Sequence, residues 1–166
     1  DVHRATYITA FRTLLSLEDY IVQSKGQFFN DTQEIFRETF YYGTINGSEA
    51  ALMNDSSFED YITKINTLAT GVDLVSSINV TNITLSHKDP WNLEVAVHAV
   101  INITDLRGVA HWRFHDTYVT EVPIYDLRDP LYSTFTDNKV PHTIREYPWD
   151  FPLVNGTNTT GLQTLI

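Results

Sequence analysis

The chemistry most widely distributed along this chain is that of an acceptor for N-linked glycans. Such an acceptor is an asparagine followed two residues later by serine or threonine, with any residue but proline between them. Eight of the eleven asparagines fit this pattern: Asn30, Asn46, Asn54, Asn79, Asn82, Asn102, Asn155 and Asn158. Because an attached glycan is bulky and must lie in water, the pattern indicates a surface-exposed extracellular chain.

The alternative is that these asparagines serve only as turn and strand residues. Asn-Gly is a strong turn signal, and it accounts for the segments NGS at 46–48 and NGT at 155–157. It does not account for NVTNIT at 79–84 or INIT at 101–104, which lie in segments that we expect to be strands. The excess of acceptor tripeptides therefore favours glycosylation.

The pair Asn79 and Asn82 poses a geometric problem. The segment INVTNITLSH at 78–87 reads as a strand, and a separation of three residues puts the two side chains on opposite faces of an unbroken strand. Either the segment is a short edge strand, or a β-bulge intervenes, or only one site is occupied. Asn102 falls on the more polar face of a predicted strand at 91–103, where a glycan can reach water.

The histidines of HWRFH, His111 and His115, are candidate metal ligands. On a helix this spacing could hold one zinc ion, but on a strand the two residues lie ~13 Å apart at ~3.3 Å per residue. His98 or Glu121 could assist only from a neighbouring strand. Because we predict a strand here, we expect no metal site and no cofactor.

The acidic segment YDLRDPLY contains Asp126, Arg128 and Asp129, which could form a catalytic or cation-binding site. Aspartate before proline is also an ordinary turn residue or cap, and an arginine between two aspartates neutralises them. The chain has no G-x-S-x-G elbow, phosphate-binding glycine loop or H-E-x-x-H motif. We therefore expect no catalytic residues and no enzyme.

The three tryptophans could form a platform for carbohydrate stacking. Trp91 and Trp112 fall on predicted core faces, so packing is the favoured interpretation. Trp149 is the one expected to be exposed.

Composition limits the partners and the architecture. The 166 residues carry a formal net charge of −10, which disfavours nucleic acid and anionic lipid as partners. The chain has no cysteine, so disulfides give no indication of its compartment, and no apolar run approaches the ~20 residues that span a bilayer. We expect one extracellular domain at residues 1–150 and a polar, glycosylated C-terminal tail at residues 151–166.

Three amphipathic helices are predicted in the N-terminal half. The first is long and ends at Gly26, with a predicted buried stripe of large apolar residues. That stripe comprises Tyr7, Phe11, Leu14, Leu15, Tyr20 and Ile21. The second begins at a capping box of Asp31 and Glu34 and ends at Gly43, and the third begins at Ser56 and Glu59 and ends at Gly71.

After Gly71 the apolar period changes from 3.6 to 2, which predicts strands. Segments at 91–104 and 109–124 flank the turn DLRG at 105–108 and should pair as a long hairpin. In the second strand the predicted core face comprises Ala110, Trp112, Phe114, Tyr118, Val122 and Ile124. Shorter extended pieces are expected at 131–136 and 142–147. Helices followed by strands predict an α+β fold, with the helices packed on one face of an antiparallel sheet.

The stretch DPWNLEVAVHAVINITDLRGVAHWRFHDTYVTEVPIYDLRDPLY, residues 89–132, resembles a group of archaeal secreted proteins related to type IV pilins. In that group an N-terminal helix and a sequon-rich middle precede paired strands and an Asp-Pro-Leu-Tyr segment, here Asp129 to Tyr132. The resemblance implies a pilin-like fold and a precursor with a basic leader and a hydrophobic first helix. This chain departs from it, because its first helix carries charges such as Arg4, Arg12 and Glu18; the hydrophobic stem would lie upstream of Asp1.

These observations together predict a non-catalytic, N-glycosylated extracellular domain at the cell surface, with a structural, adhesion or filament-subunit role. Its partners would be other surface-protein subunits, including copies of itself, and any membrane attachment would come from a segment outside this chain. The alternative is an extracellular sensor or ligand-binding module of a membrane-anchored protein. A hydrolase that uses Asp126 or Asp129 is the third interpretation.

Overall fold

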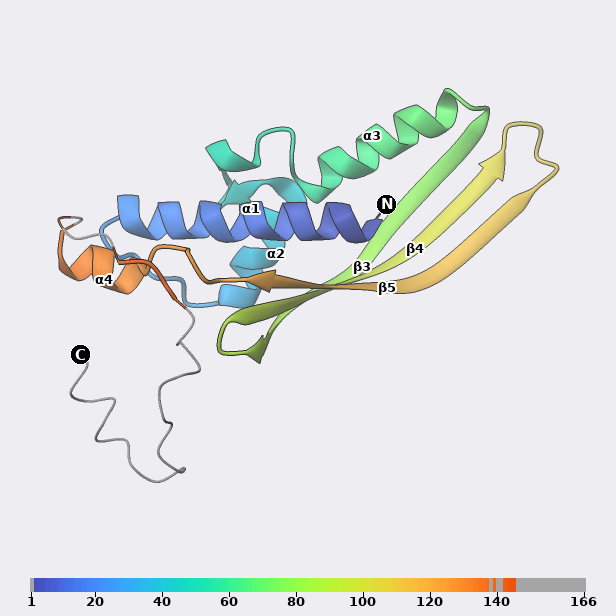
Figure 1. The fold of residues 1–166 in the computed structure, drawn as a ribbon. Coiled ribbons are helices and arrows are strands. Elements are labelled where there is room, and N and C mark those ends of the chain that lie inside the picture. Colours follow the sequence, from blue (N-terminus) through green and yellow to red (C-terminus); the bar gives the residue numbers. More distant parts are fainter. Residues whose placement is uncertain (1, 138, 140–141, 146–166) are drawn as a thin grey trace, which may run out of the picture.

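The computed structural model describes residues 2–137, 139 and 142–145, which form an α+β fold (Figure 1). The N-terminal part of the chain is mainly helical and the strands of the main sheet follow. The elements are α1 (Val2–Gln23), α2 (Thr32–Tyr42), β1 (Thr44–Ile45), β2 (Ser48–Glu49), the 3-10 helix η1 (Ala51–Met53), α3 (Phe58–Thr70), β3 (Leu74–Asp89), β4 (Asn92–Asp105), β5 (His111–Pro123) and α4 (Pro130–Phe135). The expected order of helices and strands is therefore confirmed.

The helices begin and end close to the predicted signals. The Asp31 side chain accepts a hydrogen bond from the Glu34 backbone N–H at 2.9 Å, and α2 ends at Gly43 in the left-handed region, with φ 74°. The capping box of α3 consists of Ser57 and Asp60, not of the predicted Ser56 and Glu59. The prediction was wrong by one residue because both Ser-Ser positions are followed three residues later by an acid.

The main sheet has three antiparallel strands in the order β3-β4-β5. The predicted hairpin of β4 and β5 is confirmed, and its turn is closed by a hydrogen bond from the Gly108 N–H to the Asp105 carbonyl at 2.7 Å. α1 packs mainly on β5, whereas α2 and α3 pack on β3 (Figure 1). One face of the sheet is thus covered by helices, and we call the opposite face the outer face.

The core lies between the helices and the covered face of the sheet. Its centre is a row of aromatic rings in which Phe40 stacks on Phe36 and on Phe58, with ring centroids 5.8 Å and 5.1 Å apart. From the sheet side, Val95 and Val97 are fully buried against these helices. The odd-numbered positions of β4 point inward, as the alternation predicted.

The buried face of α1 differs from the predicted one. It is formed mainly by small and polar side chains, with two larger apolar ones, Leu17 and Val22. The small and polar members include Thr6, Thr9, Ala10, Thr13 and Ser16. The Thr13 hydroxyl donates to the Thr9 carbonyl at 2.8 Å, so this buried polar group is satisfied within the helix. The expected stripe was confirmed only in part: Phe11, Leu14 and Tyr20 are partly buried against the core, whereas the most deeply buried face consists mainly of small residues, which let the helix approach its neighbours closely. Tyr7, at its start, is 38% exposed.

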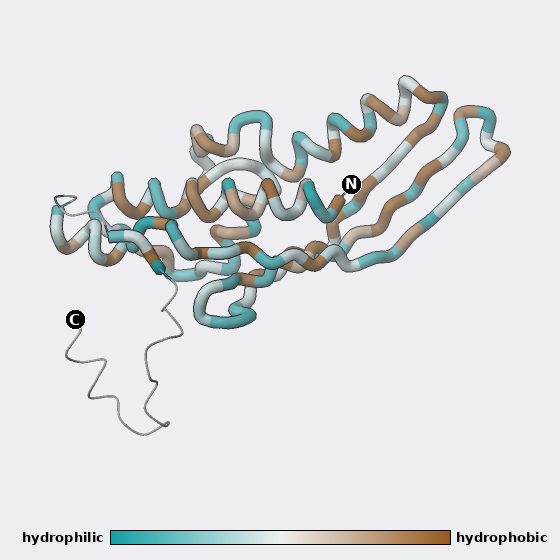
Figure 2. The backbone as a smooth tube through the Cα atoms, viewed as in Figure 1, coloured by the Kyte–Doolittle hydropathy of each residue, from teal (hydrophilic) through white to brown (hydrophobic). Residues whose placement is uncertain are grey.

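Two further predictions fail in the C-terminal half. Trp112 and Phe114 point to the helix side of β5 as expected, yet they are 46% and 49% exposed. They belong to the first half of β5, which extends beyond the N-terminal end of α1 (Figure 1 and Figure 2). Residues 130–135 form the helix α4 instead of an extended segment, with Pro130 in its first turn. Of the other predicted extended piece, Thr143 forms a bridge with Arg128.

Within the described part of the chain, no helix is both long and apolar enough to cross a bilayer. Asn155, Asn158, Trp149 and the predicted tail at 151–166 lie outside the described residues.

Candidate glycosylation surface

The outer face of the sheet is mainly polar along all three strands, although it also carries Val75, Ala96, Val100 and Val119. Its side chains are defined by the cross-strand register, in which directly opposed residues share a face. From β3 it includes Ser77, Asn79, Asn82, Thr84 and Ser86; from β4, Asn92, Glu94, His98, Asn102 and Thr104; and from β5, His111, Arg113, His115, Thr117 and Glu121. A face of this composition has no need of a protein layer over it.

A β-bulge places both acceptors of NVTNIT on this outer face. Asn79 is opposite Val100 and Asn82 is opposite His98, and the register shifts between Val80 and Asn82. Thr81 is the extra residue, so the strand gains one position and the odd spacing no longer separates the two side chains. The structure thus contains the bulge, and β3 is also an edge strand of the sheet, although with 16 residues it is a long one.

The bulge is held by the side chain of the inserted residue. The Thr81 hydroxyl donates to the His98 carbonyl at 3.2 Å, on the strand that the bulge faces. Sequence reasoning did not identify Thr81, although the spacing of three between two acceptors in a strand was the signal that could have found it.

The third acceptor on the outer face is Asn102, which is opposite Ser77 on β3 and Arg113 on β5. It is half-buried, whereas Asn79 and Asn82 are exposed. Asn79 lies diagonally across the β3–β4 pair from Asn102, at a cross-strand spacing of about 7–8 Å. Glycans at the two positions would therefore project side by side from the sheet.

The other described acceptors lie in turns, and all three are exposed. Asn46 and Gly47 have φ of 51° and 75°, the pair of positive values of a tight hairpin turn between β1 and β2. Asn30 directly precedes the N-cap of α2, and Asn54 directly follows η1. The turn interpretation and the glycosylation interpretation are compatible at these positions, since exposed turns are accessible to modification.

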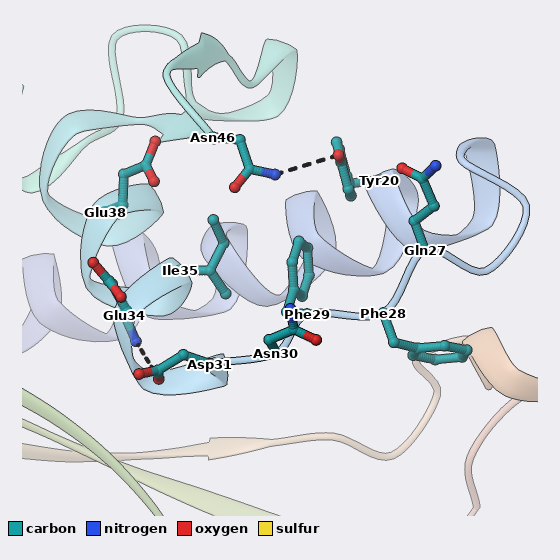
Figure 3. A pocket seen from close by; sticks show the side chains of 10 residues that line it. All are labelled: Tyr20, Gln27, Phe28, Phe29, Asn30, Asp31, Glu34, Ile35, Glu38 and Asn46. Atoms are coloured by element: carbon teal, nitrogen blue, oxygen red, sulfur yellow. Dashed lines mark hydrogen bonds between the residues drawn. The ribbon is translucent and has the colours of Figure 1, made fainter.

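Two of these acceptors border a hollow of about 420 Å³ beside α1 and α2 (Figure 3). Its lining includes Tyr20, Phe29, Asn30, Glu34, Glu38 and Asn46. The Asn46 side-chain N–H donates to the Tyr20 hydroxyl at 3.4 Å across it. The Glu38 carboxylate accepts from the Gly47 N–H at 2.7 Å and from the Thr44 hydroxyl at 2.8 Å, so it stabilises the β1–β2 turn.

The histidine candidates are not brought together for metal binding. His111 and His115 both lie on β5, where the Thr104 hydroxyl is 2.9 Å from the His111 Nδ1 and Val100 is opposite His115. His98 is 2.9 Å, through its Nδ1, from the Thr117 hydroxyl. Among the described residues no cluster of three or more His, Cys, Asp or Glu side chains could hold a metal ion.

The acidic segment has structural roles. The Asp129 carboxylate is the N-cap of α4 and accepts from the backbone N–H of Leu131 at 2.9 Å and of Tyr132 at 3.2 Å. Asp126 lies in a turn, with φ of 67°. The expectation of a turn or cap is thus confirmed for Asp129, the aspartate that precedes proline.

The expected role of Arg128 was wrong, because its ion-pair partners are on α1 and not among the neighbouring aspartates. Its Nε forms an ion pair with Glu18, which is 7% exposed, and its Nη2 lies 3.3 Å from Asp19. Hydrogen bonding to Glu18 raises the pKa of Arg128 further above its ordinary value, so the guanidinium stays charged. This pair ties the segment after β5 to the C-terminal half of α1.

The chain matches no protein-family model, no curated protein and no solved structure.

Proposed function

We propose that this chain is a non-catalytic, N-glycosylated extracellular domain at the cell surface, with a structural, adhesion or filament-subunit role. The observation that carries the proposal is the placement of the acceptors. All six acceptors within the described residues lie outside the core, and a β-bulge turns two of them onto the same face as a third. This arrangement directs the acceptor side chains to the surface, where a glycan can be attached.

The glycans would act as a polar layer over the outer face of the sheet. That face also carries apolar side chains, among them Val75, which is 51% exposed, and Val119, which is 42% exposed. Sugars at Asn79, Asn82 and Asn102 would cover such positions and keep other chains from adhering to them. They would leave the helices and the strand edges free for protein contacts.

The pilin-like and archaeal assignments are part of the same proposal. They are supported by a long helix laid along an antiparallel sheet and by the Asp129 to Tyr132 segment that follows the last strand. Attachment to a membrane or to a filament would then come from a segment outside this chain.

The non-catalytic part of the proposal is supported by the uses of the candidate side chains. Asp129 caps a helix and Glu18 holds Arg128, so these carboxylates are engaged in stabilising the fold. A general acid or base would instead need a carboxylate free to exchange a proton with a substrate.

Glycopeptide mass spectrometry of the native protein tests the proposal. We expect hexose-containing mass additions at Asn79, Asn82 and Asn102, and their loss one at a time in the variants Asn79→Gln, Asn82→Gln and Asn102→Gln. Asn66 and Asn92, which lack the acceptor pattern, are the internal controls and should be unmodified. Finding all described acceptors unmodified in native material would overturn the proposal.

A ligand-binding or sensor module is the second candidate, and the hollow at Tyr20, Phe29 and Glu38 favours it. Occupation by a ligand and by glycans would be mutually exclusive, because Asn30 and Asn46 border the same space (Figure 3). If both asparagines are unmodified while the outer-face acceptors carry sugar, a ligand search at this hollow should follow. Sugar on both would disfavour the sensor interpretation.

A further inference from the structure

The outer edge of β5 is a long strand edge without a partner strand among the described residues. At its centre the Thr117 N–H donates to the side chain of the adjacent Asp116 at 2.8 Å, a local bond that an incoming strand would replace. β5 is the last strand of the sheet, and alternate residues of a terminal strand direct their N–H and C=O groups away from the sheet. Its 13 residues form one continuous strand, which is the kind of edge that readily pairs with another chain.

The charged residues of β5 are complementary to those of a second copy of β5 in antiparallel orientation. With a two-fold axis at Thr117, Arg113 of each copy lies opposite Glu121 of the other, so the contact contains this pair twice. A register centred on Asp116 would place two aspartates opposite each other instead, and like charges directly opposed are destabilising. The centre at Thr117 is therefore the favoured one.

Both charged side chains are positioned for this contact. Arg113 is exposed on the outer face, and no ion pair to it occurs within the described part of the chain. Glu121 is exposed too. Its Oε1 forms an ion pair with Lys88, and its Oε2 forms no hydrogen bond or ion pair with another described residue. A second-copy arginine can bind that free oxygen.

The same register also covers exposed aromatic side chains on the helix side of the sheet. Trp112 and Phe114 are 46% and 49% exposed, and they would lie opposite Val122 and Thr120 of the second copy. Pairs of an aromatic and a β-branched residue are among the favourable cross-strand pairs.

The helices leave room for this pairing. The ring of His3 lies edge-on to Tyr118, with centroids 5.3 Å apart, so the N-terminal end of α1 reaches only to the middle of β5. From there α1 runs towards Arg128, away from Trp112 and Phe114. The two-fold axis at Thr117 therefore sets the covered half of each β5 beside the uncovered half of the other, and the two α1 helices do not overlap.

An apolar surface of α1 lies where the second copy would come. Tyr7 and Ile8 are 38% and 45% exposed, and Tyr7 stacks on Phe11 with ring centroids 6.4 Å apart. Tyr7 is one helical turn from His3, which touches β5. Trp112 and Phe114 of the second copy would reach this surface, which the core of a single chain leaves unused.

We propose that two copies of this chain associate through antiparallel pairing of their β5 edges about Thr117, forming a continuous six-stranded sheet with the helices on one side and the glycan acceptors on the other. The inference deepens the proposed function, since it names a contact between subunits, and it rests on that function only in supposing that copies meet at one surface. Glycans project from the outer face and so do not enter the plane in which the strands pair.

Cysteine trapping tests the register directly, because the chain has no cysteine of its own. In Thr117→Cys the two new side chains are directly opposed, with Cβ atoms about 4.5–5.5 Å apart, close to the reach of a disulfide. In the control Val119→Cys they are separated by ~13 Å along the strand. We expect a disulfide-linked dimer from Thr117→Cys and at least about tenfold less from Val119→Cys; equal yields, or none from either, would overturn the proposal.

Charge exchange provides an independent readout by analytical ultracentrifugation. Arg113→Glu and Glu121→Arg should each weaken self-association at least about tenfold, since each replaces two attractive pairs by two repulsive ones. The double variant should restore association. Lys64→Glu, a charge reversal on α3, which packs on the opposite edge strand β3, is the matched control and should leave self-association unchanged. Failure of the double variant to restore association would contradict the pairing.

These experiments are done on the protein with its glycans and on the same chain produced without them. Association without sugar would support the interface even if mass spectrometry of native material found no glycans. Conversely, glycosylated protein that stays monomeric and forms no Thr117→Cys dimer would overturn the interface and leave the glycosylation proposal intact.

Discussion

The two edges of the sheet are treated differently by the rest of the chain. At the β3 edge, the Gln33 side chain of α2 donates to the Leu85 carbonyl and accepts from the Leu85 N–H at 3.2 Å, and the Arg37 Nε donates to the Ile83 carbonyl at 2.7 Å. One amide side chain thus makes the two bonds that a neighbouring strand would make.

The β5 edge receives no such bonds from other elements within the described residues. α1 covers the face of β5 near Tyr118 and beyond, but no described strand pairs with the outer edge of β5, where the Thr117 N–H donates to the side chain of its own neighbour Asp116 at 2.8 Å. A single sheet can therefore have one edge closed within the chain and another that is open to a second copy. The difference teaches that a strand's edge and its face must be considered separately when partners are inferred.

The largest test of this comparison uses two phenylalanines, one in the core beside β3 and one on the open part of β5. Phe40→Ala removes a fully buried ring and should lower the free energy of unfolding by about 3–5 kcal/mol. Phe114→Ala removes a ring that is 49% exposed and should cost about 0.5 kcal/mol or less in the monomer. Urea unfolding at low protein concentration measures both.

A cost for Phe114→Ala as large as that for Phe40→Ala would contradict the comparison. It would mean that the first half of β5, which α1 does not cover, is stabilised within a single chain. The proposed interface would then lose its apolar part.

The second test concerns the only ion pair of the described residues that involves a buried carboxylate. Arg128→Ala leaves Glu18, which is 7% exposed, without its cation, and we expect a loss of about 2 kcal/mol, reduced from the fully buried case because Arg128 is 42% exposed. Asp19→Asn removes the more exposed ion pair, between Arg128 and Asp19, and should cost about 0.5 kcal/mol or less of stability. Thermal unfolding of both variants provides the measurement. Equal losses of stability would contradict the view that the Arg128–Glu18 ion pair is the stronger of the two contacts.

The sequence predicted the strands and their faces, but not how far the helices cover them. The period of two along β4 and β5 correctly predicted the hairpin and the face of each side chain. It could not predict that Trp112 and Phe114 would stay exposed, because periodicity defines a face and not the length of the helix that covers it.

The sequence identified the residues of the candidate glycosylation surface but could not predict how they are arranged on the sheet. The acceptor asparagines follow directly from the tripeptide pattern, whereas their common face depends on the bulge at Thr81, which is one of several outcomes compatible with NVTNIT. The buried hydroxyl face of α1 was missed for another reason. Threonine reads as polar, yet a hydroxyl bonded to the preceding turn of its own helix can be buried without an unsatisfied group.

A smaller effect is expected when the β3 edge is opened. Gln33→Ala leaves the N–H and C=O of Leu85 without their side-chain partner, and we expect a loss of about 1 kcal/mol. Gln33→Glu is the sharper variant, because its carboxylate can accept from the N–H but repels the carbonyl. Both should also increase self-association through β3, measured by ultracentrifugation, and unchanged association would contradict the view that Gln33 closes this edge.

The smallest effect is expected at the turns, where Asp89 and Asp105 connect β3 to β4 and β4 to β5. The Asp89 carboxylate accepts from the Asn92 side-chain amide at 3.0 Å and from the Trp91 N–H at 2.8 Å, and these bonds lower its pKa below the ordinary value of 3.8. A lowered pKa in the folded state means that the carboxylate stabilises the fold above its unfolded pKa and that this contribution is lost as the pH falls through the folded value.

Asp89→Asn should therefore be less stable than the wild type at neutral pH, and the difference should shrink as the pH falls from 3.8 through the lowered pKa of Asp89 in the folded state. Asp105 accepts only one backbone bond of this kind, from the Arg107 N–H at 3.3 Å, so Asp105→Asn is the matched control and should show a smaller difference at neutral pH. Urea unfolding across the acid range measures both. An Asp89→Asn difference that persisted in acid would show that the turn depends on the shape of the side chain and not on its charge, and the two turns would then differ in packing alone.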